Sequence, residues 1–127
     1  MANSDKSILI IMERGGYPDF SSLFNSAGFG VVIETSMRKA ISRLKRNTPD
    51  VVIAEFNFQT DFRDRSSSLE SLMATLQRSP DVKVIVFYEK EHVIHFNRLK
   101  ERYDFHCVLE FPILENKLQG CILNITE

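Results

Sequence analysis

Two carboxylates, Glu13 and Glu55, stand at the ends of apolar segments and are the first candidates for chemistry. Glu13 closes the segment SILIIME, and Glu55 follows the segment VVIA. If these segments are neighbouring strands, the two carboxyl groups can share a metal ion or a proton. A hard cation needs further oxygen ligands, and none is evident beside them. We expect each carboxylate to be solvated or bonded to loop amides, and an enzyme that uses them as acid and base stays an alternative.

Aromatic side chains crowd the same segment ends. They are Phe56, Phe58, Phe62, Tyr88 and Phe111. Buried together, such rings form a small core that seals the site. Exposed, they are typical anchors for a protein partner. The sequence leaves both interpretations open, and the burial of Phe58 and Phe62 separates them.

Three other motifs lack the residues that would complete a site. His92 and His95 are spaced i, i+3, but no fourth zinc ligand lies at a diagnostic spacing. Gly15 and Gly16 match neither of the glycine motifs that bind nucleotides, and they are more simply a turn. The serines at 66–68 lack the GxSxG context of a hydrolase. We therefore expect no metal, no cofactor and no nucleophilic serine.

A strongly basic segment could bind an acidic partner or nucleic acid. It carries Arg38, Lys39, Arg43, Lys45 and Arg46. Charged helix faces are usually just solvated, and no aromatic residues interleave these cations to stack on bases. The net charge of −1 supplies no global field that would attract a polyanion. We therefore do not expect nucleic acid as a partner.

The hydrophobic pattern predicts the elements that position these residues. Continuous β-branched and aliphatic runs predict buried strands over residues 7–13, 30–35, 51–56, 82–88 and 107–111. Apolar residues at helical spacing predict helices over about residues 18–27, 36–44, 69–76, 91–102 and 115–124. Residues 57–67 have no clear period, and we expect them to form a long loop.

Strict alternation of buried strands and helices predicts an α/β fold. The expected architecture is a flavodoxin-like (βα)5 three-layer sandwich with a parallel five-stranded sheet in the order 2-1-3-4-5. Residues 1–127 form one domain in this scheme, since no linker or repeat interrupts the pattern. Ligands of such folds bind beyond the carboxyl ends of the strands, so the residues at those ends decide the function.

These strand ends resemble those of response-regulator receiver domains, the CheY-like family, and the topological likeness covers nearly the whole chain. Pro49-Asp50 with the segment VVIAE, and Phe111-Pro112-Ile113, are the closest local likenesses. In that family the first strand ends in an acidic pair and the third in a phosphate-accepting aspartate. The fourth ends in serine or threonine and the fifth in lysine before proline. The resemblance implies bacterial signal transduction, such as a two-component system.

The resemblance also shows which family residues this chain lacks. It places Met12 and Glu13 at the acidic pair, Glu55 at the phosphoacceptor, Tyr88 at the hydroxyl position and Phe111 at the lysine. Methionine supplies no hard oxygen ligand, and glutamate displaces the nucleophile by a methylene. Phenylalanine supplies no charge to offset a transferring phosphoryl group. We therefore expect a degenerate pseudo-receiver that is not an enzyme and works through protein–protein contacts.

The resemblance further implies where a partner binds. Receivers commonly use the surface of the fourth helix, fifth strand and fifth helix for dimers and output contacts. With the aromatic loop, this gives a set of candidate partner-binding residues, which are Phe58, Phe62, Phe96, Leu99, Arg102, Glu110 and Leu118. The alternative is a small-ligand or nucleotide sensor that uses the same rim, with Gly15, Gly16 and residues 57–65 as walls.

The two cysteines and the first apolar segment indicate the cellular compartment of the protein. Cys107 and Cys121 both lie in apolar segments, which fits reduced, buried thiols better than a disulfide framework. The first apolar stretch is too short for a signal-peptide core or a membrane span. We expect a cytoplasmic protein with no membrane anchor.

Overall fold

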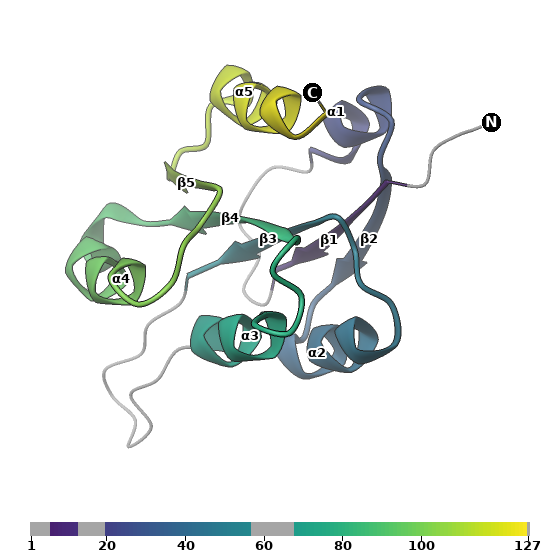
Figure 1. The fold of residues 1–127 in the computed structure, drawn as a ribbon. Coiled ribbons are helices and arrows are strands. Elements are labelled where there is room, and N and C mark those ends of the chain that lie inside the picture. Colours follow the sequence, from purple (N-terminus) through teal and green to yellow (C-terminus); the bar gives the residue numbers. More distant parts are fainter. Residues whose placement is uncertain (1–5, 13–19, 57–67, 127) are drawn as a thin grey trace.

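The computed structural model describes residues 6–12, 20–56 and 68–126 of the chain, which build one parallel sheet covered by helices on both faces (Figure 1). The sheet has five strands in the order β2-β1-β3-β4-β5, and all four pairings are parallel. The strands are β1 (Ser7–Ile11), β2 (Gly30–Glu34), β3 (Val51–Glu55), β4 (Lys83–Tyr88) and β5 (Cys107–Glu110). The predicted fold class and strand order are confirmed.

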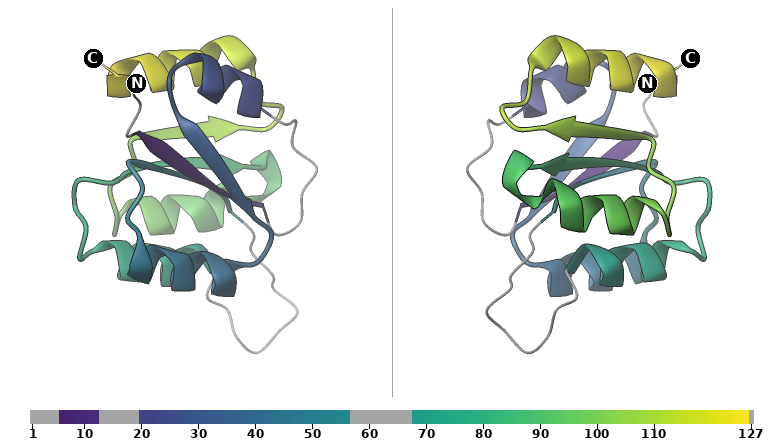
Figure 2. Two further views of the ribbon diagram at one scale, coloured as in Figure 1. Left: turned by 90° about the vertical axis from the view of Figure 1, so that its right-hand side faces the viewer. Right: turned by 90° about the vertical axis from the view of Figure 1, so that its left-hand side faces the viewer.

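Helices follow each of the five strands and form the two outer layers. They are α1 (Ser21–Ser26), α2 (Met37–Arg46), α3 (Ser68–Leu76), α4 (Val93–Lys100) and α5 (Glu115–Thr126), with a short 3-10 turn, η1 (Lys90–His92), before α4. Figures 1 and 2 show that α1 and α5 cover one face of the sheet, while α2, α3 and α4 cover the other. This arrangement places the carboxyl ends of all five strands at one edge of the sheet, because every crossover returns the chain to the same side.

Two hydrophobic clusters fill the spaces between the layers. One packs α2, α3 and α4 against the sheet around Leu9, Val52 and Val86. The other packs α1 and α5 against the opposite face around Ile8, Ile53 and Ile85. The alternation follows from the pleat, which turns successive side chains to opposite faces. Strands β1 and β3 are therefore buried on both faces, as their continuous apolar runs predict.

Two helix ends carry residues suited to those positions. Ser36 caps α2, and its Oγ accepts a hydrogen bond from the backbone N–H of Lys39 at 3.3 Å. Gly28 ends the segment after α1 with a φ of 95°, a left-handed conformation that glycine adopts without steric cost. The predicted start of the first helix at Pro18 lies outside the described residues.

The prediction of two reduced thiols is wrong, because Cys107 and Cys121 form a disulfide. Helix α5 packs back over the sheet beside β5 and brings the two Cα atoms within 6.3 Å, a separation that a disulfide spans. Disulfides are rare in reducing compartments. The expectation of a cytoplasmic location rested partly on free thiols and loses that support.

Two further features of the backbone and helices complete the description. The Phe111–Pro112 peptide bond is cis. In residues 6–12, 20–56 and 68–126, no helix combines the length and the apolar character that crossing a bilayer requires.

Candidate functional site

The carboxyl edge of the sheet carries four of the five residues that the sequence places at the site. Met12 follows β1, Glu55 and Tyr88 end β3 and β4, and Phe111 follows β5. In the strand register, Glu55 lies beside Phe87 and Tyr88 lies beside Glu110. The fifth residue, Glu13, lies outside the described residues. The predicted meeting of Glu13 with Glu55 therefore stays a prediction.

Glu55 is enclosed at the end of the central strand. Its exposed fraction is 3%, and it is the buried charged residue of the described chain. Met12, which follows the neighbouring strand β1, is half-buried, and its side chain offers only a thioether. In the described part of the chain, no group of three His, Cys, Asp or Glu side chains is placed to hold a metal ion. Among the described residues, the end of the central strand thus presents an enclosed carboxylate and no open cluster of oxygen ligands.

Tyr88 is tied to its surroundings by its ring and by its hydroxyl. The ring stacks on Phe96, with centroids 4.9 Å apart and planes inclined by 28°. The hydroxyl donates a hydrogen bond to Oε1 of Glu110 at 3.5 Å. Burial raises the pKa of Tyr88 above 10.0, and the negative charge and hydrogen bond of Glu110 raise it further. A neutral, anchored phenol therefore occupies the end of β4.

Phe96 is the centre of an aromatic cluster formed by Phe56, Tyr88, Phe96 and Phe105. Its ring centroid lies 5.2 Å from that of Phe56 and 5.6 Å from that of Phe105. Phe56 and Phe96 are 3% and 1% exposed, so these rings form part of the core beneath α4. Such ring pairs stabilise beyond their buried area. The interpretation of an aromatic core applies to these residues, whereas Phe58 and Phe62 lie outside the described residues.

Phe111 differs from the other rings because it is 41% exposed. With Glu89, Lys90 and Glu91 it lines an open depression of about 590 Å³ at the carboxyl ends of β4 and β5. The backbone N–H of Phe111 donates to the carbonyl of Tyr88 at 2.8 Å, which fixes the position of the residue. The depression is walled by charged side chains and one ring.

The candidate partner-binding residues on α4, β5 and α5 divide by burial. Phe96, Leu99 and Leu118 are 1%, 3% and 0% exposed, so their side chains pack in the core and are out of a partner's reach. Arg102 and Glu110 are exposed. These elements and their connections also carry exposed apolar residues that the sequence did not indicate, which are Ile94, Leu114 and Leu123. For Ile94 and Leu123, the one signal in the sequence is an apolar residue off the inward stripe of its helix.

Comparisons with known proteins give structural matches alone. No family model matches the chain, and no curated protein does. A response-regulator receiver domain protein from Clostridium thermocellum is similar, with a TM-score of 0.73, 19% identity, and coverage of 95% of this chain and 94% of that one. A response-regulator receiver protein from Sinorhizobium medicae is also similar. Its TM-score is 0.72 at 20% identity, with coverage of 95% of this chain and 94% of that one.

A third match is the chemotaxis protein CheY4 of Vibrio cholerae. Its TM-score is 0.69 at 14% identity, with coverage of 94% of this chain and 98% of that chain. These identities establish similarity of fold. With five parallel strands in the order 2-1-3-4-5 and five helices, the chain has the flavodoxin-like fold of response-regulator receiver domains.

Proposed function

We propose that the protein is a receiver-like regulatory domain that acts through protein contacts and does not undergo aspartyl phosphorylation. The supporting observation is the carboxyl edge of the sheet, where Glu55 is buried and Phe111 stands exposed. The resemblance to receivers assigns these positions to the phosphoacceptor and to a lysine. A longer, enclosed carboxylate and an uncharged ring replace them here.

The chemistry of phosphoryl transfer explains why these replacements matter. A phosphoryl group in transfer carries negative charge, which enzymes offset with a cation and a lysine or arginine. Met12 supplies no oxygen ligand for magnesium, and Phe111 supplies no positive charge. Burial of Glu55 also limits the approach of a phosphodonor to its carboxylate. Each change opposes the reaction.

Without phosphorylation, the protein would act by binding a protein partner or a second copy of the chain. The surface that the resemblance indicates comprises α4, β5 and α5. On these elements and their connections, Ile94, Phe111, Leu114 and Leu123 are 68%, 41%, 51% and 52% exposed. Exposed apolar side chains gain free energy when a partner buries them. Arg102 and Glu110 supply the charged part of this surface.

NMR spectra with acetyl phosphate and Mg²⁺ test the proposal. Backbone amide signals of Ala54, Glu55 and Tyr88 are expected to stay unchanged, since neither ion nor phosphoryl group binds there. Selective shifts of these signals that require both reagents would overturn it. The contact surface is tested separately by replacing Ile94 and Leu123 with glutamate and measuring molar mass by light scattering. We expect loss of any dimer, with Ser42→Glu on the exposed face of α2 as control.

A further inference from the structure

Strand β2 ends the sheet on the side away from β5. The N–H of Gly30 donates to the carbonyl of Lys6, and the carbonyl of Glu34 accepts from the N–H of Met12, each at 3.0 Å. Backbone groups of successive strand residues face opposite sides. The N–H and carbonyl groups of Val31 and Ile33 therefore face outward, and no other strand of the described chain pairs with them.

Within the part of the chain that the structure describes, this edge lacks several devices that usually protect edge strands. Natural edges carry lysine, proline or a bulge that prevents pairing with another strand. The sequence of β2, GVVIE, contains neither lysine nor proline. Val32 and Ile33 are 37% and 49% exposed on opposite faces of the strand. The described residues thus leave this edge open to an added strand.

A cavity lies under β2 on the face that α2 covers. Its volume is about 220 Å³, and its lining is mostly apolar, with Leu9, Val32 and Pro49 contributing to it. The side chain of Arg43 forms part of the wall. Strand addition draws specificity from pockets that take alternate side chains of the added strand. An apolar side chain that projects toward α2 fits this cavity.

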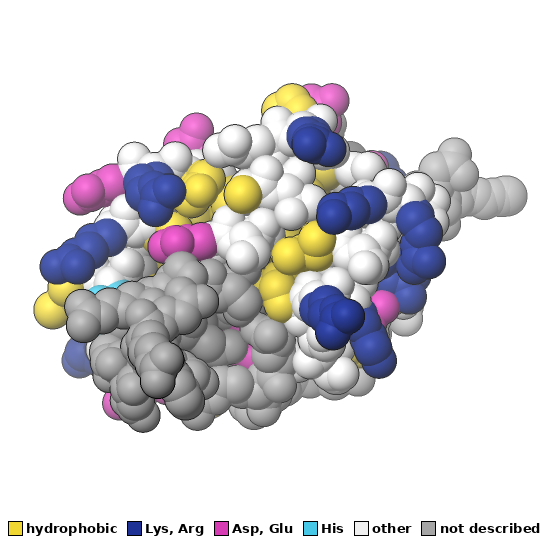
Figure 3. Space-filling model, turned by 90° about the horizontal axis from the view of Figure 1, so that it is seen from below, with side chains coloured by type: hydrophobic (Ala, Val, Ile, Leu, Met, Phe, Trp, Pro, Cys, Tyr) yellow, Lys and Arg dark blue, Asp and Glu magenta, His cyan; other side chains and the backbone are white. Residues whose placement is uncertain are grey.

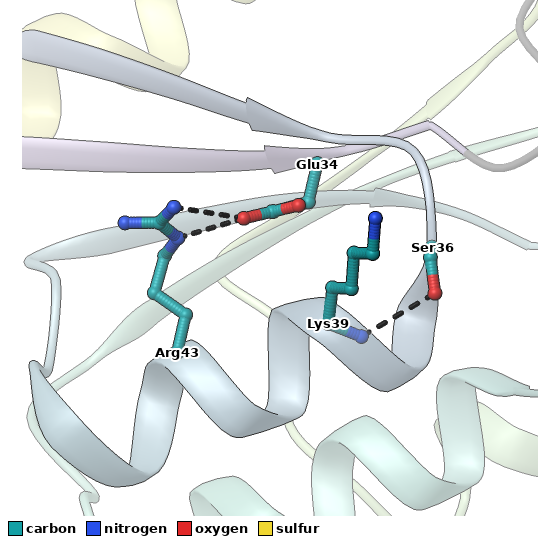
Figure 4. Close-up of polar contacts among 4 residues, drawn as sticks. All are labelled: Glu34, Ser36, Lys39 and Arg43. Carbon is teal, nitrogen blue, oxygen red and sulfur yellow. Dashed lines mark hydrogen bonds and ion pairs between the residues drawn. The ribbon is translucent and has the colours of Figure 1, made fainter.

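Positive charge lies along the same edge. Arg43 on α2 is bound to Glu34 on β2, with both Nε and one terminal nitrogen 2.9 Å from Oε2 (Figure 4). Lys39 and Arg46 precede and follow Arg43 by four and three residues, so all three lie along one side of α2. Figure 4 shows Lys39 and Arg43 extending toward β2, and Figure 3 shows cations gathered over the part of the molecule where α2 lies.

We propose that the β2 edge binds an extended acidic segment of a partner protein, which adds to the sheet as a further strand. Val31 and Ile33 supply the backbone hydrogen bonds, the cavity takes an apolar side chain, and Lys39 and Arg46 bind acidic side chains. The proposal goes beyond the proposed function, since it concerns the sheet edge, which the phosphorylation tests do not probe.

Charge selects this occupant over a second copy of the chain. Antiparallel pairing of β2 with β2 of another copy, about a two-fold axis normal to the sheet, would set the two α2 helices side by side. Lys39, Arg43 and Arg46 of both copies would then face one another, and Glu34 is the one acidic residue that the described strand β2 and helix α2 offer against them. Like charges across an interface oppose association. An added strand with acidic side chains would instead be attracted by these cations.

A synthetic peptide provides the probe. It has about eight residues, with valine and glutamate alternating on one face and threonine on the other. Fluorescence anisotropy of the labelled peptide measures its binding to the whole chain. We expect saturable binding, a loss of about tenfold when lysine replaces glutamate, and loss of binding when the edge-facing amides are N-methylated.

Matched variants of the protein locate the site. The pair Lys39→Glu and Arg46→Glu is expected to weaken binding about tenfold. The pair Arg38→Glu and Lys45→Glu changes the charge of the same helix equally, on another side of it, and is expected to have a small effect. Ile33→Pro removes an outward N–H, leaves the pairing with β1 in place and is expected to abolish binding.

Three results would overturn the proposal. The first is equal weakening by both charge-reversed pairs, which would indicate non-specific attraction to a basic helix. The second is undiminished binding of the N-methylated peptide, which would exclude strand addition. The third is self-association of the chain that Val32→Lys abolishes, with no binding of the peptide, which would assign the edge to a second copy.

Discussion

The Tyr88 hydroxyl lies 3.5 Å from Oε1 of Glu110, and this contact joins the carboxyl ends of β4 and β5. The two residues are register partners in the sheet, so their side chains leave the same face of neighbouring strands. A phenol with its ring stacked on Phe96 therefore stands where the resemblance to receivers places a small hydroxyl residue. The position is held by packing as well as by a hydrogen bond.

We expect Tyr88 to ionise above the ordinary pKa of 10.0, because burial and Glu110 both favour the neutral phenol. Because the folded state holds the phenol proton more tightly than the unfolded state, Tyr88 contributes its full stabilisation below a pH of about 10. This contribution is lost as the pH rises through the pKa of Tyr88 in the folded protein. Ultraviolet titration of the chain minus that of Tyr88→Phe isolates the group. Glu110→Gln should lower the Tyr88 pKa partway, since burial remains. An unchanged titration in that variant would exclude the role of Glu110.

Truncating Phe96 should cost far more stability than truncating Phe111. Phe96 is 1% exposed and touches three other rings, so Phe96→Ala leaves a cavity that costs about 3–5 kcal/mol. Phe111 is 41% exposed, and Phe111→Ala should change the unfolding free energy by less than about 1 kcal/mol. Urea unfolding measures both. Equal costs would mean that Phe111 belongs to the core.

The interaction energy between Glu34 and Arg43 should be small. The side chain of Arg43 is 39% exposed and that of Glu34 is 15% exposed, so water and salt screen the pair. A double-mutant cycle with Glu34→Ala and Arg43→Ala should give a coupling energy of about 0.5–1 kcal/mol that falls as salt is added. A coupling that stays constant up to molar salt would contradict this account.

The disulfide between Cys107 and Cys121 should stabilise the fold measurably. It closes a segment with a sequence separation of 14 residues. For a loop of this size, restriction of the unfolded chain is worth about 3 kcal/mol. Reduction with dithiothreitol should lower the urea midpoint accordingly, and the double variant Cys107→Ala, Cys121→Ala should show no further response to reductant. A midpoint that ignores dithiothreitol in the unaltered chain would show that the bond contributes little.

Much of the fold could be predicted from sequence because its strands are buried on both faces. The runs around Leu9, Val52 and Val86 are continuously apolar, and their alternation with helices leaves few possible topologies. Strand β2 is the exception. Its run GVVIE has the composition of a buried strand, yet Val32 and Ile33 are exposed, because nothing in a local pattern distinguishes the edge of a sheet from its centre.

The site could be predicted only in part. Sequence placed Met12, Glu55, Tyr88 and Phe111 correctly at strand ends, since the ends of apolar runs are visible. It could not tell that Phe111 is exposed, because the exposure of a residue that follows a strand depends on how the neighbouring elements pack around it. The pairing of Cys107 with Cys121 likewise depends on the return of α5 to β5, which spacing does not reveal.

Intact mass spectrometry after incubation with acetyl phosphate and Mg²⁺ tests the central claim most directly. The whole chain should keep its unmodified mass, while a receiver domain with the complete family residues, treated in parallel, gains one phosphoryl group. Phosphorylation of this chain that Glu55→Gln abolishes would contradict the account, because it would show that the enclosed carboxylate still accepts a phosphoryl group.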